Sequence, residues 1–261
     1  MTGAYVEWDG DLRIATLVLN RPEVMNAIDV PMARAIGTAV AQIADLGPRA
    51  VVMRGNGRGF VAGGDVKRFA DNFATSATVI DELLDALHPA IVTLSQLSAP
   101  KIASVHGAVA GAGLSLMSGC DLVIAADTSR FLMAYDRIGA AMDCGGSWYL
   151  PRRIGRRKAT ALMLLSETWE AKTAHSCGLV DKVCAEAALA DETRALAERL
   201  AKRPTAAFAA WRRLMDAAET RSLSEHLEME RKEFREATRT QDFAEGVSAF
   251  LEKRAPDFRG H

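Results

Sequence analysis

Short hydrophobic runs in the first half of the chain are separated by turns that contain glycine or proline. The run at 13–20 is apolar and rich in β-branched residues, and it stops at Arg21-Pro22, which is typical of a strand. Three further apolar runs have the same character, at 50–53, 101–105 and 122–126. We therefore expect buried strands at all four places.

Segments with apolar residues at helical spacing alternate with these strands. They lie at 31–45, before Gly47-Pro48, at 77–97 and, after a glycine-rich turn, at 114–118. Strands that alternate with helices predict an α/β core.

The last third of the chain has a different pattern. Residues 205–245 contain no glycine or proline and are rich in Ala, Leu, Glu, Lys and Arg, so this region is predicted to be helical. Its apolar stripes could cover either the protein's own core or a partner subunit, and they include Leu223, Leu227, Met229, Phe234 and Phe243. We divide the chain into a core, 1–200, and a C-terminal helical region, 201–261.

Composition places the 261-residue chain among ordinary soluble proteins, with 49% hydrophobic and 25% charged residues. The formal net charge of -1 argues against a general nucleic-acid binder, which is usually basic. The N-terminus has no signal-peptide pattern, and no apolar run reaches the roughly 20 residues that span a bilayer. The 4 cysteines form no CxxC pair and have no histidine at zinc-ligand spacing. We therefore expect a cytoplasmic protein with reduced thiols, no metal site and no membrane partner.

Most of the 20 glycines lie between Gly55 and Gly146. Two glycine-rich turns, 55–64 and 107–113, each follow a strand and precede helical sequence. Such turns leave backbone N–H groups free, and these groups can hold a phosphate or an oxyanion. No GxGxxG, GxxxxGK[ST] or GxSxG motif is present. An oxyanion hole therefore explains the two glycine-rich turns better than a phosphate site does. The alternative is that the glycines are needed only for close packing.

Four segments, in this order, resemble the crotonase (enoyl-CoA hydratase/isomerase) superfamily: RPEVMNA at 21–27, GFVAGGD at 59–65, GAVAGAG at 107–113 and GCD at 119–121. The resemblance extends from about Val6 to Phe258. It implies a spiral of ββα units followed by C-terminal helices that build a homotrimer or a dimer of trimers. It also implies a coenzyme A thioester substrate and no separate cofactor. Asp121 resembles a structural aspartate of the family.

The same resemblance implies positions for the chemistry. The oxyanion donors would be the backbone N–H groups of Gly64 and Ala112. The two glutamates of the hydratases would fall at Ser115 and Tyr135, so neither glutamate is present. We therefore expect no water addition by the two-glutamate route. Ser115 is a poor general base, and Tyr135 is expected to line the acyl pocket, with hydrogen-bond donation as the alternative.

Asp143, eight residues after Tyr135 in a glycine-bounded loop, is the remaining acid/base candidate. The residues around Asp143, together with the segments 145–151 and 245–256, resemble the sequences of isomerases that shift double bonds in enoyl- or dienoyl-CoA. These include the 1,2-epoxyphenylacetyl-CoA isomerases. There the aspartate would move a proton between carbons. A loop carboxylate that caps a helix is the structural alternative.

Asp143 also resembles the nucleophile of 4-chlorobenzoyl-CoA dehalogenase, in which a histidine, here His88, would activate water. A packed or surface position is the competing interpretation of His88. An atypical hydratase and a non-catalytic CoA- or RNA-binding member of the fold are further alternatives.

The remaining candidates surround these positions. Trp148 could bound the acyl group, and Asp136 adjoins the site but is expected at the surface. By resemblance, CoA would contact Met25, Ala27, Ala62, Gly64, Asp65 and Val66, and also Phe250 and Lys253 of the same chain or of a neighbouring subunit. Asp65 is also expected to cap a helix. Five cations within 152–158 are expected at the start of a helix in solvent, or in an interfacial ion-pair cluster.

Overall fold

The four predicted strands lie next to one another in a six-stranded sheet of the computed structural model, which describes residues 3–70 and 73–261. They are β2 (Ile14–Asn20), β3 (Ala50–Gly55), β4 (Lys101–Val105) and β6 (Leu122–Ala126). These four strands are parallel, and every residue of β4 is buried, as expected for a strand covered on both faces. The sheet is completed at its edges by the antiparallel β1 (Gly3–Asp9) and the parallel β9 (Lys182–Cys184).

A second, three-stranded sheet has the order β5-β7-β8 and contains β5 (Ala108–Ala110), β7 (Arg130–Leu132) and β8 (Thr168–Glu170). Successive turns of the chain add one strand to the large sheet, one to the small sheet, and then a helix. Thus β4 and β5 lead to α4 (Ala112–Ser118), and β6 and β7 lead to α5 (Gly146–Ile154). This repeat confirms the spiral of ββα units that the resemblance implied.

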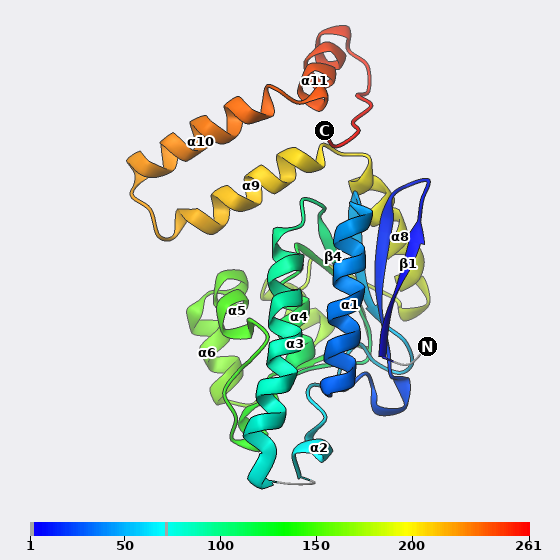
Figure 1. Ribbon diagram of the computed structural model, residues 1–261, viewed down its shortest axis with the longest axis vertical. Coiled ribbons are helices and arrows are strands. Elements are labelled where there is room, and N and C mark those ends of the chain that lie inside the picture. Colours follow the sequence, from blue (N-terminus) through cyan, green and yellow to red (C-terminus); the bar gives the residue numbers. More distant parts are fainter. Residues whose placement is uncertain (1–2, 71–72) are drawn as a thin grey trace.

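Helices cover both faces of the large sheet (Figure 1). On one face, α1 (Val30–Leu46) and α3 (Ser76–Gln96) contribute to a core with Val51 and Met53 of β3. On the other face, α8 (Leu189–Ala201) packs with Ala50 and Val52 of the same strand. Alternate residues of one strand therefore belong to two cores, because successive side chains of a strand point to opposite faces.

The boundaries of α1 follow from its terminal residues. Asp29 is the N-cap, and its carboxylate accepts a hydrogen bond from the Met32 N–H at 2.9 Å. Gly47 ends the helix with a φ of 57°, a conformation that favours glycine. The remaining short helices of the core are α2 (Val66–Ala70), α6 (Arg156–Leu164) and α7 (Ala171–Ser176), with 3₁₀ turns at Pro22–Val24, Phe73–Thr75, Asp136–Ile138 and Glu186–Ala188.

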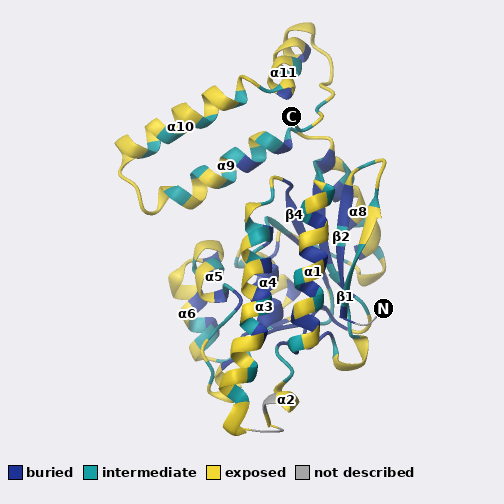
Figure 2. Ribbon diagram, viewed as in Figure 1, coloured by how far each residue is buried: buried dark blue, intermediate teal, exposed yellow. Residues whose placement is uncertain are grey.

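Three C-terminal helices project from this core: α9 (Thr205–Ala218), α10 (Leu223–Ala237) and α11 (Gln241–Glu252). Figure 2 shows that they are largely exposed, and every described residue of α10 is exposed or half-buried. Large apolar side chains on these helices reach solvent, including Trp211, Leu227, Phe234 and Phe250. In the described ranges, no helix is both long enough and apolar enough to cross a bilayer.

Asp121 links α9 to the core. The guanidinium of Arg212 in α9 donates to both carboxylate oxygens of Asp121, at 2.9 and 3.0 Å. The buried ammonium of Lys101 lies 3.1 Å from the same carboxylate. Burial lowers the pKa of Lys101, and the negative charge of Asp121 opposes that shift. Asp121 thus has the structural role that the resemblance implied.

Candidate active site

The two glycine-rich turns lie side by side. Val61 pairs in parallel with Val109: the Val61 N–H donates to the Ala108 carbonyl at 3.2 Å, and the Val61 carbonyl accepts from the Ala110 N–H at 2.9 Å. The same register places Gly63 beside Gly111, and a Cβ at Gly111 would lie only 3.3 Å from the Gly63 Cα. Both glycines have positive φ angles, 111° and 50°. The close contact and these angles explain why glycine occupies both turns.

This register also brings Gly64 next to Ala112. Among the described residues, neither N–H donates to a main-chain carbonyl, whereas the Asp65 N–H bonds to the Ile28 carbonyl at 2.9 Å. Ala112 is the first residue of α4, so its N–H has no acceptor within the helix. Two adjacent turns therefore each offer a free backbone donor, which is the arrangement that an oxyanion hole requires.

The buried Asn26 anchors the first turn. Its side-chain amide donates to the carbonyls of Asn56, Gly59 and Phe60 at 2.9, 3.0 and 2.9 Å, and its side-chain oxygen accepts from the Arg21 N–H at 2.7 Å. Asn26 lies in the first family motif, RPEVMNA, and no role was predicted for it from the sequence. The sequence feature that could have indicated this role is a polar residue placed between two apolar ones, Met25 and Ala27.

Arg21 holds the segment after Gly64. Its guanidinium lies 2.9 Å from the Asp65 carboxylate and 3.2 Å from that of Asp29. The sequence favoured a helix-capping role for Asp65, whereas in the structure its carboxylate pairs with Arg21. The role of Arg21 was also missed, because only the fold brings the carboxylates of Asp29 and Asp65 together at its guanidinium.

The expected CoA contacts fall in two separate regions. Near the first turn, the Ala62 N–H donates to the Met25 carbonyl at 3.0 Å, Ala27 is buried and Val66 is exposed. By contrast, Phe250 lies on α11 and Lys253 directly follows it, both exposed and at the opposite end of the molecule from α2 (Figure 1). A single chain therefore does not bring these two residues to the turns.

Three side chains from different segments meet beside α4. The Tyr135 hydroxyl donates to Oδ1 of Asp143, and the Ser115 Oγ lies 3.2 Å from the Tyr135 Oη. Ser115 is fully buried on α4, Tyr135 is buried after β7, and Asp143 lies in the loop before α5. The two positions where hydratase glutamates would fall are thus connected to Asp143 by hydrogen bonds. Tyr135 was expected chiefly as a lining residue, and its hydroxyl has this additional role.

The backbone around Asp143 is unusual. Cys144 has a φ of 53° and Ala134 one of 63°, and positive φ angles are uncommon for residues other than glycine. Such conformations concentrate at functional sites. The N-cap of α5 is Gly145 with no side-chain cap, so Asp143 does not have the capping role considered from sequence.

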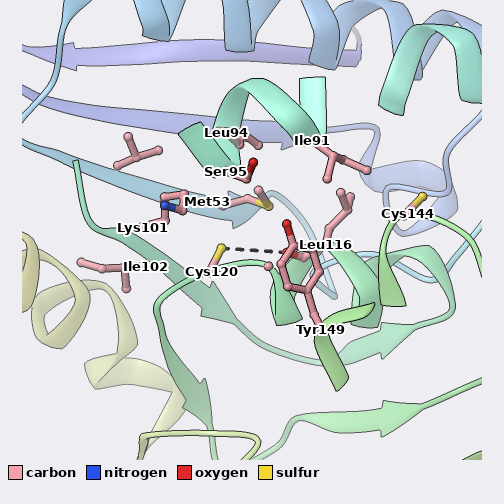
Figure 3. A pocket seen from close by; sticks show the side chains of 12 residues that line it. Met53, Ile91, Leu94, Ser95, Lys101, Ile102, Leu116, Cys120, Cys144 and Tyr149 are labelled. Carbon is pink, nitrogen blue, oxygen red and sulfur yellow. Dashed lines mark hydrogen bonds between the residues drawn. The ribbon is translucent and has the colours of Figure 1, made fainter. Parts of the chain in front are cut away.

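Burial keeps the groups around Asp143 neutral. Burial first, and then the charge of Asp143 and its hydrogen bond, raise the pKa of Tyr135, so the phenol remains a donor. Burial and Asp143 likewise raise the pKa of the Cys144 thiol. Cys144 also lines a small cavity of about 20 Å³, on the side opposite Lys101 (Figure 3). In the same lining, burial raises the pKa of Cys120 to about 12.

The other candidates lie outside this hydrogen-bonded group. His88 is exposed on α3, and Asp136 is exposed in the 3₁₀ turn after Tyr135. Trp148 is half-exposed beneath the Arg152 guanidinium, 3.5 Å from its ring centroid, and lines a hollow of about 410 Å³ between α5 and α9. In the part of the chain that the structure describes, none of these three forms a hydrogen bond or ion pair with Asp143.

The cations at 152–158 divide into two sets. Arg152 pairs with Glu219 of α9 at 2.8 Å, and Arg153 donates to the carbonyls of Ser118 and Cys120. The other three are exposed at the start of α6, as expected: Arg156, Arg157 and Lys158. No group of three or more His, Cys, Asp or Glu in the described residues could hold a metal ion.

Comparison with known proteins shows the family of the chain. The family model for enoyl-CoA hydratase/isomerase matches residues 10–261. The chain is 38% identical to 1,2-epoxyphenylacetyl-CoA isomerase of Escherichia coli K12 over 249 residues, covering 95% of both chains. It is 32% identical to trans-2-decenoyl-[acyl-carrier-protein] isomerase of Streptococcus mutans, covering 96% of both.

A solved structure gives the same result for the fold. An enoyl-CoA hydratase from Polaromonas sp. JS666 superimposes with a TM-score of 0.91 at 33% identity, covering 98% of this chain and 100% of the other. The chain therefore belongs to the enoyl-CoA hydratase/isomerase family.

Proposed function

We propose that this enzyme moves a proton, and with it a double bond, within an enoyl-CoA-type thioester. The observation that carries the proposal is the Asp143 carboxylate, held by Tyr135 beside the helix that begins with Ala112. An isomerase needs one group that both takes and returns a proton, and a carboxylate can do both. Two of the relatives are named as isomerases, which also supports this reaction.

In the proposed reaction, the thioester oxygen accepts hydrogen bonds from the N–H groups of Gly64 and Ala112. Asp143 takes a proton from one carbon of the acyl group, and the C–H electron pair moves into conjugation with the thioester. The oxygen becomes enolate-like and the two N–H donors stabilise it. Asp143 then returns a proton to another carbon, which shifts the double bond and regenerates the carboxylate. The thioester itself accepts the electron pair, so the reaction needs no cofactor.

The competing reactions have less support. The dehalogenase mechanism needs a histidine that activates water beside Asp143, and His88 is exposed on α3 without a bond to Asp143. A two-acid hydratase needs a second carboxylate, yet Ser115 and Tyr135 occupy those positions. Ser115 is also tightly packed: a Cβ at Gly146 would lie 2.3 Å from its Oγ.

The C-terminal helices are proposed to assemble the enzyme as a homotrimer or a dimer of trimers. Leu223, Phe234 and Phe250 are 74%, 68% and 83% exposed, which is unfavourable in water. Assembly would also allow Phe250 and Lys253 to contact a CoA bound to a neighbouring copy. Light scattering should give the mass of three or six chains, and a monomer at micromolar concentration would contradict the assembly.

The reaction is tested by chromatographic separation and mass analysis of the products from a panel of CoA thioesters, because an isomer has the same mass as its substrate. The panel contains 3-enoyl-CoA and 2-enoyl-CoA chains of several lengths, a ring epoxide of an arylacetyl-CoA, and 4-chlorobenzoyl-CoA. We expect at least one member to give an isomer of unchanged mass. A product that gains the mass of water would indicate a hydratase, and replacement of chlorine by hydroxyl would indicate a dehalogenase.

A further inference from the structure

The two hydroxyls beside Asp143 form a hydrogen-bond chain with a defined direction. Tyr135 has one O–H, and it is donated to Oδ1 of Asp143. In the contact of 3.2 Å between Ser115 and Tyr135, the Ser115 hydroxyl must therefore be the donor. The other acceptor within reach of Ser115 is the Gly111 carbonyl, which is farther away at 3.4 Å. The chain of donors thus runs from Ser115 through Tyr135 to Asp143.

We infer that Ser115 and Tyr135 are positioning residues that hold Oδ1 of Asp143 and leave Oδ2 to carry the substrate proton. This inference rests on the proposed function, since it assigns the atom of Asp143 that exchanges the proton. Oδ1 accepts from Tyr135 whether Oδ2 is bare or protonated. The network can therefore persist while a C–H bond breaks, an O–H bond forms at Oδ2, and the proton returns to carbon.

Ser115 connects the hydrogen-bond chain to the helix that carries the Ala112 oxyanion donor. Ser115 follows Ala112 by three residues on α4, so the two lie on the same side of the helix, one turn apart. One short buried helix thus carries an oxyanion donor at its first residue and the start of the hydrogen-bond chain at its fourth. Through Tyr135, the hydrogen-bond chain therefore ties the Asp143 carboxylate to the helix that carries the oxyanion donor.

Tyr135 acts through Asp143 and not as an acid. Its hydroxyl hydrogen is already engaged in the hydrogen bond to Asp143, and burial next to a carboxylate raises the pKa of Tyr135. The other titratable group at the carboxylate is the Cys144 thiol, whose pKa is also raised. Both neighbouring groups are thus held in their protonated forms, and the proposal assigns the proton transfer to Asp143.

The test is a kinetic cycle with Tyr135→Phe, Ser115→Ala and the double variant, measured on the isomerised thioester. Misplacing a catalytic group by about 1 Å can cost about 100-fold, so Tyr135→Phe should lower kcat by roughly 10- to 100-fold with KM changed less than about threefold. Ser115→Ala should lower kcat by a smaller factor. The double variant should be no slower than Tyr135→Phe, because Ser115 acts through Tyr135.

Two matched controls keep folding separate from positioning. Ser118→Ala changes another buried serine of α4, whose hydroxyl bonds to the Leu114 carbonyl at 2.7 Å. Tyr149→Phe changes a tyrosine of α5 whose hydroxyl has no hydrogen-bond partner in the described part of the structure. Both controls should keep kcat close to wild type. Thermal unfolding of every variant shows whether it is folded.

Several outcomes would overturn the inference. Full kcat in Tyr135→Phe would do so, and so would losses that multiply in the double variant or that fall on KM alone. Asp143→Asn is the separate arm for the proposed function. If Asp143→Asn is inactive while the hydroxyl variants are unaffected, only the positioning inference fails. If Asp143→Asn is fully active, the proposed function fails as well.

Discussion

Asp143→Asn is expected to lower kcat by about 10²- to 10⁴-fold, the usual contribution of a general acid/base. Asparagine has nearly the same size, and its side-chain oxygen can still accept the Tyr135 hydroxyl. The amide cannot take a proton from carbon, however, so binding should persist while isomerisation stops. Steady-state kinetics on the isomerised thioester checks the loss in kcat, and calorimetry with the same thioester checks that it still binds.

The matched control for this variant is Asp136→Asn. Asp136 is exposed in the neighbouring turn, so losing its charge should leave kcat within about twofold of wild type. Equal losses in the two variants would mean that general electrostatics, and not proton transfer by Asp143, sets the rate. An Asp143→Asn variant with wild-type kcat would exclude Asp143 as the base.

Ala112→Pro is expected to lower kcat by about 10²- to 10³-fold, which corresponds to about 2.7–4 kcal/mol for one oxyanion donor. Proline removes the N–H that we assign to the thioester oxygen, and its ring enters the space in front of that N–H. The helix should tolerate the change, because Ala112 is the first residue of α4, where proline is favoured. The preceding residue is Gly111, which has no Cβ to meet the proline ring. Kinetics and thermal unfolding together check the prediction.

Arg156→Pro is the control for the proline itself. Arg156 is the first residue of α6, is exposed, and also follows a glycine. This variant should unfold at nearly the wild-type temperature and retain its kcat. Wild-type kcat in a folded Ala112→Pro enzyme would remove Ala112 from the oxyanion hole.

The four central strands of the large sheet were predictable because they are largely buried, whereas the more exposed edge strands β1 and β9 were not predicted. β4 and β6 are nearly continuous apolar runs, and such runs are distinctive in a sequence. The three-residue strands β5, β7, β8 and β9 gave no comparable signal, because three residues cannot show a period. The small sheet exists through the tertiary contacts of the spiral, so the family resemblance, and not local pattern, anticipated it.

The candidate site was predictable in its positions but not in its bonds. Motif resemblance pointed to Gly64 and Ala112, and the parallel register of Val61 with Val109 explains why these residues lie together. The bonds among Ser115, Tyr135 and Asp143 join α4, the end of β7 and the loop before α5. Only the packing of two successive ββα turns brings those segments into contact, so residue spacing could not show whether Tyr135 lines a pocket or donates a bond.

The C-terminal region shows a similar division. The absence of glycine and proline predicted helices, and α9, α10 and α11 are helices. Their direction, away from the core, is set by the turn at 202–204 and by the bond from Arg212 to Asp121. Pro204 marks the turn in the sequence, whereas the bond from Arg212 to Asp121 has no local signature there.

The central claim is that Asp143 moves a proton between carbons of an acyl-CoA thioester. The most direct measurement is the incubation with 3-enoyl-CoA thioesters run in D₂O under single-turnover conditions, with mass spectrometry of both product and protein. We predict an isomer with an unchanged carbon skeleton and an unmodified Asp143, with deuterium at the receiving carbon only to the extent that Oδ2 exchanges its proton with solvent before returning it. An acyl or aryl ester on Asp143, or a product that contains added water, would contradict the account.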